Sequence, residues 1–462
     1  MKIYFTSVLL YFVFLANSQA QGSFERLYRY WYYGEGNEVF EEEDGYILAG
    51  VGGAGAMNYL FIMKTGYNGD TLWMKQLELK ELGSNYPWIT SSVRDQSGNT
   101  YFALEDMHDL PCLFKFDPQW NLLWQKKPEQ NFTIRRMTMS RDNSILCVGK
   151  DSTAYCIRKL NTEGTSLWRS SDIYCNPWGY LAFSSIHEMP DNAVVLISSW
   201  INNTWYSPDK STITVYSPDG DSVSSAVFNP PGGNYTISDT KLIGDEMISI
   251  GGRYPVNEIT ASLIRHKADG TILMDKILSR ESTMYRISLT GDGKVVTSGY
   301  ISRGPMVQQA VLQCMTLEGD SLWSSAIGYA GSIWLYTPLV CRDKGILLGG
   351  FAALNSWPEG YPYFVKTDSM GRISPVGIPD LPAKTATVYP NPTSGRIFVS
   401  VPQGYKGNLE IYDALGHLCY SAPVNDGATT FDLGFLNPGI YIYHLLNPEE
   451  VSTGKLIIRI LQ

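Results

Sequence analysis

The sequence of 462 residues has little of the chemistry on which most catalytic and metal sites depend. Its five histidines are dispersed and form neither an HExxH motif nor a pair at metal-ligand spacing. It contains no GxSxG nucleophile elbow and no P-loop. We therefore predict no motif-marked catalytic residue, no metal site and no cofactor.

Cysteine and positive charge are also scarce. The seven cysteines are scattered without a CxxC pair, so we expect buried free thiols, with a Cys147–Cys156 bridge across a hairpin as the alternative. Lys and Arg number 36 against 45 Asp and Glu, which gives a formal net charge of −9. Because an acidic chain has no electrostatic footprint for nucleic acid, nucleic-acid binding is not expected.

Long apolar runs are confined to the first residues. Lys2 is followed by an almost wholly apolar stretch from Ile3 to Leu15, and the small residues Ser18 and Ala20 come next. This pattern is typical of a secretory signal peptide, which we assign to residues 1–20. Later apolar runs fall short of the roughly 20 residues that span a bilayer, so we expect an exported chain without a transmembrane segment.

A short phrase recurs through most of the remaining chain. "GDTLW" begins at Gly69 and "GDSLW" at Gly319, and weaker copies lie between and after them. The copies recur about every 50 residues. Their marker positions are Gly69, Asn121, Gly164, Gly220, Gly270, Gly319 and Gly371. Seven units of this length are typical of a β-propeller or a similar array.

Each unit reads as strand, tight turn, strand, longer loop, strand, tight turn, strand. Four strands in each of seven units predict an all-β, seven-bladed β-propeller over residues 21–377. The opening segment 24–34 has no unit of its own, and the last unit lacks a full fourth strand. We expect the ring to close by pairing residues 24–33 with residues near 362–368, which leaves no exposed edge.

Residues 378–387 form a Pro-rich linker, and residues 388–462 predict a small β-sandwich domain. The phrases "YPNPTSGRI", "IYDALG", "LNPGIYIYHL" and "GKLIIRI" resemble the C-terminal sorting domain of proteins exported by the type IX secretion system of Bacteroidetes. The residues that match this pattern are Pro390, Asn391, Pro392, Gly395, Asp413, Gly416, Gly439, Tyr441 and Lys455. The Pro and Gly residues also suit turns, and Tyr441 also suits the sandwich core.

The resemblance implies that the outer-membrane export machinery reads residues 388–462 as an address. The protein is then expected on the outer cell surface or secreted. The resemblance says nothing about the ligand of the propeller. The repeat units are also similar to those of quinoprotein dehydrogenase propellers, but the chain has seven units instead of eight and no adjacent cysteine pair, so no quinone cofactor is expected.

Tryptophans divide into two groups by their phase in the repeat. Trp73, Trp124, Trp168 and Trp323 hold the same place in their units, so we expect them to pack one blade on the next. The others fall in two longer loop classes that emerge on one face, and we expect them around the channel mouth, either as a ligand-binding surface or as loop cores. They are Trp88, Trp178, Trp200, Trp205, Trp334 and Trp357.

Two classes of function fit this face. The first is a non-enzymatic binding module for a glycan or a protein. The second is an extracellular carbohydrate-active enzyme, a hydrolase or lyase, which needs paired carboxylates about 5–10 Å apart near the channel mouth. The candidate acids are Glu38, Asp106, Asp109, Glu188 and Glu359, and their spacing singles out no pair. We favour the binding module.

Overall fold

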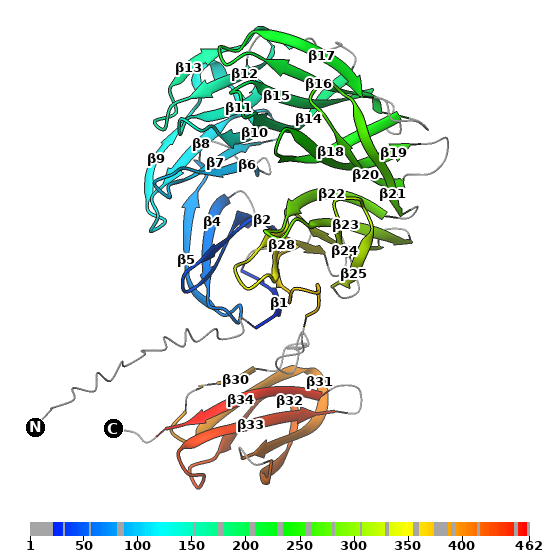
Figure 1. Ribbon diagram of the computed structural model, residues 1–462. Helices are drawn as coiled ribbons and strands as arrows, with labels where there is room; N and C mark the ends of the chain where they lie inside the picture. Colours follow the sequence, from blue (N-terminus) through cyan, green and yellow to red (C-terminus); the bar gives the residue numbers. More distant parts are fainter. Residues whose placement is uncertain are drawn as a thin grey trace, which may run out of the picture. The chain divides into compact units, whose positions relative to one another are not determined.

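The computed structural model divides the chain into two compact units, Met1–Val376 and Gly377–Gln462. Figure 1 shows the first unit as a ring of β-sheets, with the inner strands of the blades toward the centre. The structure describes residues 22–459 except 31–32, 55–56, 81–86, 107, 152–153, 174–178, 203–207, 229–233, 255–259, 280–281, 305–306, 329–331, 354–359, 374–386, 390, 392, 414–415 and 448–450. The predicted signal peptide lies outside these residues, and so does most of the predicted linker.

The first six blades each contain four antiparallel strands that pair in sequence order. The strands of the first three blades are β2 (Tyr33–Glu42), β3 (Gly45–Ala54), β4 (Met57–Thr65) and β5 (Thr71–Glu78); β6 (Trp88–Arg94), β7 (Thr100–Glu105), β8 (Cys112–Phe116) and β9 (Leu122–Lys126); β10 (Thr133–Met139), β11 (Ile145–Lys150), β12 (Tyr155–Leu160) and β13 (Ser166–Arg169). A 3-10 turn, η2 (Glu129–Asn131), precedes β10.

The next three blades repeat this order. Their strands are β14 (Gly179–Glu188), β15 (Val194–Asn202), β16 (Pro208–Tyr216) and β17 (Ser222–Phe228); β18 (Asn234–Ile243), β19 (Glu246–Tyr254), β20 (Thr260–His266) and β21 (Ile272–Ser279); β22 (Ser282–Leu289), β23 (Val295–Gly304), β24 (Val307–Met315) and β25 (Ser321–Ile327). The all-β class and the four-stranded unit are therefore as predicted.

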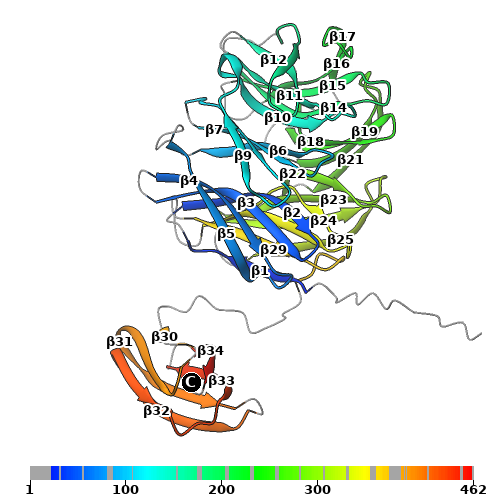
Figure 2. The same ribbon diagram turned by 90° about the vertical axis from the view of Figure 1, so that its left-hand side faces the viewer.

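The seventh blade is built from both ends of the ring. Its strands are β26 (Ser332–Leu335), β27 (Leu339–Val340), β28 (Ile346–Ala353), β29 (Tyr361–Lys366) and β1 (Phe24–Leu27). β1 pairs antiparallel with β29, with Phe24 opposite Lys366 (Figure 2). The predicted closure is confirmed, but the opening strand is shorter than expected, because Tyr33 already begins the first blade. Seven blades close the ring.

The hydrophobic core is divided among the blade interfaces. Each cluster of buried side chains in the ring combines residues from two neighbouring blades, for example Ile47 and Phe102 between the first and second. The closing strand contributes Phe24, which is 5% exposed, to the cluster that joins the seventh blade to the first. The stability of the ring therefore depends on every blade meeting its neighbours.

The repeated phrase has a specific packing role at these interfaces. Its glycine has a positive φ in every copy that contains one, which glycine adopts without strain. A Cβ on Gly220 would lie 2.7 Å from Trp168 of the preceding blade, and one on Gly371 would lie 2.3 Å from Trp323. The tryptophan of one copy thus covers the glycine turn of the next, which explains why both residues recur.

The inner strands share a β-bulge at one matched position. In each of the first six blades the register between the first and second strand shifts by one residue. The extra residues are Asn37, Thr90, Arg135, Ser184, Ser238 and Tyr285. In the seventh blade the inner strand is instead interrupted between β26 and β27, at residues 336–338. These bulges were not predicted from the sequence.

Side chains next to the bulges link neighbouring blades. A bulge releases a backbone N–H from the strand ladder, and that group needs another acceptor. The N–H of Met137 donates to Oγ of Ser91 at 2.9 Å, and the N–H of Ile287 donates to Oδ2 of Asp239 at 3.1 Å. These bonds join the second blade to the third and the fifth blade to the sixth beside their bulges.

The C-terminal unit is a sheet bent around its own core. It contains β30 (Thr387–Tyr389), β31 (Arg396–Tyr412), β32 (Leu418–Asp432), β33 (Gly439–Leu446) and β34 (Val451–Ile458). The long strand β31 pairs with β30 near its start, with β33 near its end and with β32 along most of its length. Buried side chains such as Ile397, Leu409 and Tyr441 fill the inside. The sandwich-like arrangement agrees with the prediction.

The cysteines among the described residues carry free thiols. Cys147 lies opposite Arg158 and Cys156 lies opposite Gly149, so the two are out of register in their hairpin. Both are fully buried, and burial raises the pKa of each thiol, that of Cys156 to about 11. Buried free thiols are found as expected at Cys112, Cys147, Cys156, Cys314 and Cys341, whereas Cys419 is partly exposed and Cys175 lies outside the described residues. The alternative bridge is not formed.

Candidate functional site

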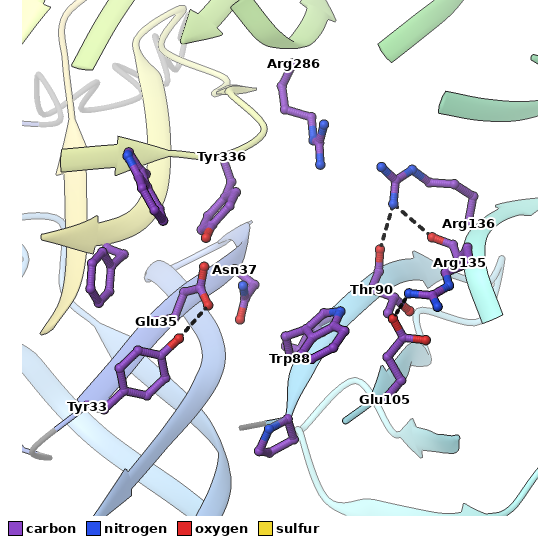
Figure 3. Close-up of a pocket in the computed structure, with 14 residues that line it drawn as sticks. Tyr33, Glu35, Asn37, Trp88, Thr90, Glu105, Arg135, Arg136, Arg286 and Tyr336 are labelled. Atoms are coloured by element: carbon purple, nitrogen blue, oxygen red, sulfur yellow. Dashed lines mark hydrogen bonds and ion pairs between the residues drawn. The ribbon is translucent and has the colours of Figure 1, made fainter. Parts of the chain in front are cut away.

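A cavity of about 670 Å³ opens among the inner strands of the ring. Its walls come from the first, second, third, sixth and seventh blades, close to where the inner strands begin. The side chains around it are drawn in Figure 3. The lining residues are Tyr33, Glu35, Asn37, Pro87, Trp88, Ile89, Thr90, Glu105, Arg135, Arg136, Arg286, Trp334, Tyr336 and Phe351.

The shared bulge explains how so many different side chains reach this cavity. Asn37, Thr90 and Arg135 are the extra residues of three bulges, and Tyr336 lies in the break of the seventh inner strand. A strand without a bulge would alternate its side chains between the two faces, whereas an extra residue turns a side chain out of that alternation. The same backbone device therefore presents a different group in each blade.

One side of the cavity is aromatic. The rings of Tyr33 and Trp334 each lie 5.8 Å, centroid to centroid, from the ring of Phe351. Trp334 is 36% exposed, and its indole N–H donates to Oε1 of Gln308. Tyr336 adds a further ring to this side, whereas Trp88 lies across the cavity, near Thr90 and Glu105 (Figure 3). Flat, partly exposed rings with a fixed orientation suit stacking on a planar or sugar-like ligand.

The other side is cationic. Arg135 pairs with Glu105 and with Asp109, the latter at 3.0 Å. Nη1 of Arg136 donates to the carbonyl oxygens of Thr90, at 3.2 Å, and Arg135, at 2.9 Å. Figure 3 shows Arg286 pointing toward Arg136. Burial, and then the positive charge of Arg286, lower the pKa of Arg136 to about 10.

Two carboxyl groups of the lining have raised pKa values. Burial raises the pKa of Glu35 to about 7, although the Tyr33 hydroxyl donates to its Oε2 at 3.3 Å. Burial also raises the pKa of Glu105 to about 7, against the opposing charge of Arg135. Oε2 of Glu105 is buried and finds no hydrogen-bond partner among the described residues. Near neutral pH both groups therefore titrate, which is uncommon for glutamate.

The predicted aromatic face is only partly within the described residues. Trp88 and Trp334 line the cavity, but they belong to the inner strands β6 and β26 and not to loops as expected. Trp200 lies in β15 and not in a loop, and its side chain lies outside the described part. Trp178, Trp205 and Trp357 also lie outside it. The placement of these four around the cavity stays a prediction.

The candidate acids are distributed around the ring. Asp109 reaches the cavity rim through its pair with Arg135. Oδ1 of Asp106 accepts the N–H groups of His108 and Leu110 and so forms a turn. Glu188 accepts the N–H of Arg141, and Glu359 lies outside the described residues. Glu38 follows the first bulge, where burial raises its pKa.

Glu35, Glu105 and all three arginines were not among the residues predicted from the sequence. A signal for two of them was present: Arg136 and Arg286 hold the same position in "TIRRM" and "TMYRI", the inner strands of two repeat units. An alignment of the first strand of each repeat unit, in addition to the fourth, would have revealed this shared position. Within the described residues, no group of three or more His, Cys, Asp or Glu side chains is placed to hold a metal ion.

The residues that carry the sorting resemblance have structural roles in the C-terminal unit. The Asn391 side chain donates to the carbonyl of Lys455 at 2.6 Å and accepts the N–H of Ile457 at 2.9 Å, so it clamps the edge of β34. Oδ1 of Asp413 accepts the N–H of His417, and Gly416 has a φ of +84° in the same turn.

The remaining matched residues also serve packing and turns. The ring of Tyr441 is 8% exposed, and its hydroxyl donates to the carbonyl of Asn437 at 2.9 Å. A Cβ on Gly395 would lie 2.8 Å from the backbone of Gly434. Gly439 begins β33 and has no such close contact. Pro390 and Pro392 lie outside the described residues.

Residues 387–459 match the family model of the secretion system C-terminal sorting domain. The predicted sorting domain is confirmed, and it indicates export of the protein to the outer surface or into the medium by the type IX machinery. In the part of the chain that is described, no helix is long and apolar enough to cross a membrane. A sequence search among curated proteins finds no significant match.

Similar solved structures are distant. A streptogramin B lyase is 13% identical over 74% of this chain and 97% of its own, with a TM-score of 0.45. Drosophila plexin A in complex with semaphorin 1b is 8% identical over 74% and 86%, with a TM-score of 0.44. A protein of unknown function from Dyadobacter fermentans is 12% identical over 63% and 97%, with a TM-score of 0.43. Structural similarities this weak say nothing about the function of this chain.

Proposed function

We propose that this exported propeller is a non-enzymatic binding module for a glycan and that the cavity at the channel mouth is its binding site. The observation that supports the proposal is a single cavity lined both by several aromatic rings and by three guanidinium groups. Rings stack on the apolar face of a sugar, while charged donors bind its oxygens. Presentation outside the cell fits such a ligand.

The shape of the site favours a glycan segment over a protein partner. Small-ligand sites are concave and measure roughly 300–1,000 Å³, and the cavity of about 670 Å³ falls in that range. A stable protein interface would instead bury about 800 Å² on each partner, most of it on an open surface. A recessed cavity inside a ring of strands admits a narrow chain more readily than a folded domain.

One observation supports a second candidate, a carbohydrate-active enzyme. Glycosidases use one carboxyl group that is still protonated near neutral pH as a general acid, with a second carboxylate across the sugar. The pKa values of Glu35 and Glu105, each about 7, meet the first requirement. Glu105, however, is tied to Arg135, so Glu35 is the better candidate acid.

The two candidates are separated by testing binding and turnover on the same samples. The chain beginning at residue 21 would be applied to a glycan array, and each bound glycan would be incubated with it and examined by mass spectrometry for cleavage. Binding without cleavage supports the module. Cleavage that is lost in Glu35→Gln would establish the enzyme instead. If no glycan is bound or cleaved, both candidates are wrong.

Tryptophan substitutions test whether the cavity is the site. We expect Trp88→Ala and Trp334→Ala each to lower affinity about tenfold, because a stacked ring typically contributes one to a few kcal/mol. Trp168→Ala is the matched control. Trp168 lies on the outer strand β13, away from the inner strands, and its ring covers Gly220 of the next blade. Equal losses in all three variants would mean that the effect is one of stability and not of contact.

A further inference from the structure

The cavity concentrates positive charge in a protein that is acidic overall. The chain has a formal net charge of −9, yet Arg135, Arg136 and Arg286 all line one cavity. Two of them come from the third blade and one from the sixth, so the cluster is assembled across the channel and not along one strand. An arrangement of this kind is costly unless something of opposite charge shares the space.

The charge balance of this cluster depends on the protonation of nearby carboxyl groups. Glu38 and Asp239 both act favourably on the guanidinium of Arg136, whereas Arg286 and Arg135 oppose it. Asp239 already accepts the N–H groups of Ile287 and Thr240, and Glu105 is committed to Arg135. Burial favours the neutral form of Glu35, Glu38 and Glu105 alike. Each carboxyl that takes up a proton leaves the arginines less compensated.

Arg286 is the arginine of this cluster that lines two cavities. It also lines a second, smaller cavity of about 260 Å³, together with Gly299, Tyr300, Trp334, Leu335 and Tyr336. Arg286, Trp334 and Tyr336 are therefore common to both cavities. A group bound at Arg286 would lie beside the exposed ring of Trp334, so charge recognition and ring stacking are available to one ligand.

We propose, on the premise that the cavity binds a glycan, that its ligand is an anionic glycan whose acidic group is held between Arg136 and Arg286 while a sugar ring stacks on Trp334. Guanidinium groups bind carboxylates and sulfates through paired, charge-assisted hydrogen bonds, and they do so best in a partly dry site. The acidic group is a carboxylate or a sulfate ester, both of which present a flat or forked set of oxygens.

The first test changes the ligand and leaves the protein intact. Binding of the chain from residue 21, with its C-terminal unit retained, would be measured by calorimetry with short oligogalacturonides and with their methyl-esterified forms. A second arm would use sulfated galactan oligosaccharides and their desulfated forms. The charged member of at least one pair is expected to bind about tenfold to a hundredfold more tightly, because charge-assisted hydrogen bonds are the stronger class.

The outcomes separate this inference from the proposed function. A preference in the first arm identifies a carboxylate as the recognised group, and a preference in the second identifies a sulfate. Equal binding of charged and neutral members overturns the anionic inference but leaves a glycan-binding module. If neither these probes nor any glycan on the array is bound, the proposed function itself is wrong, and the inference falls with it.

The second test changes the protein. Arg286→Gln is expected to abolish the preference for the charged member, while Arg286→Lys keeps part of it because the charge remains without the fork. Arg265→Gln is the matched control, because Arg265 is also partly buried and pairs with Glu246 away from the cavity. Melting temperatures would identify any variant that fails to fold. A preference that persists in folded Arg286→Gln overturns the assignment.

Affinity for the charged member should also depend on pH. Glu35 lies beside Tyr33 and Asn37, and Glu105 faces Arg135, Asp109 and Trp88. As the pH falls through about 7, both glutamates take up protons, which removes negative charge from the lining of the cavity and weakens the pair between Glu105 and Arg135. Affinity should therefore rise between about pH 8 and pH 6, while that of the neutral member stays constant. A parallel change in both members would contradict charge recognition.

Discussion

The outer and inner strands of the blades occupy equivalent repeat units but differ in what they repeat. At the outer strands the same turn glycine and tryptophan return, and Trp124, Trp168 and Trp323 each cover the glycine of the next blade. On the inner strands the bulge returns, but the residue after it changes. These residues are Glu38, Ser91, Arg136, Ser185, Asp239 and Arg286. Arg136 and Arg286 line the cavity, whereas Ser91 and Asp239 accept backbone N–H groups of the next blade. Recurrence thus marks packing, while the varied position serves both packing and the candidate site.

Of the predicted changes, removal of the closing strand β1 should have the largest effect on stability. A chain that starts at Tyr30 lacks β1 and loses the buried rings of Phe24 and Tyr28. Since each buried ring is worth about 3–5 kcal/mol, we expect more than about 5 kcal/mol of lost stability, measured by chemical denaturation. The ring should unfold as a whole, because every core cluster joins two blades. Unchanged unfolding would contradict closure by β1.

Tryptophans of the two groups should differ in their contribution to stability. Trp323 is half-buried against the cluster between the sixth and seventh blades, so Trp323→Ala should lower the free energy of unfolding by about 2–3 kcal/mol. Trp334 is 36% exposed and should cost about 1 kcal/mol. Thermal unfolding of both variants tests the comparison. If Trp334→Ala is the more destabilising of the two, the side chain of Trp334 is part of the hydrophobic core and not of a binding surface.

Two glycines in equivalent turns of different blades test the contact between tryptophan and glycine more finely. Gly371 and Gly270 have similar positive φ values, +71° and +85°. A Cβ would meet Trp323 at 2.3 Å in the first case, but only the Cβ of Ala226 at 3.1 Å in the second. Gly270→Ala should cost about 1 kcal/mol for the backbone alone, and Gly371→Ala about 2 kcal/mol because the ring must move. Equal losses would show that the tryptophan contact is not tight.

The sequence predicts the architecture better than the site for a physical reason. Turn glycines and apolar strands act locally, so their period is visible in the letters, and the copies at Gly69 and Gly319 suffice to count blades. The cavity depends on residues brought together by closure of the ring, such as Arg136 and Arg286, which are 150 positions apart. The bulges that aim them leave no marked composition. Tryptophans were found because aromatic residues stand out individually.

The smallest expected effect concerns a single proton at the inner wall. The pKa of Glu35 is about 7 in the folded protein against an ordinary value of 4.5, so between these pH values the folded state holds a proton that the unfolded chain has released. The free energy of unfolding should therefore fall as the pH rises from about 4.5 to 7. Glu35→Gln should make this fall shallower by about 1 kcal/mol, since partial exposure weakens the full effect.

Glu318→Gln, at an exposed outer turn, is the control and should leave the slope unchanged. Denaturant unfolding at pH 5, 6, 7 and 8 would measure it. If Glu35→Gln follows the same pH dependence as the parent chain, Glu35 is ionised throughout, and the cavity carries one more negative charge than the binding proposal assumes.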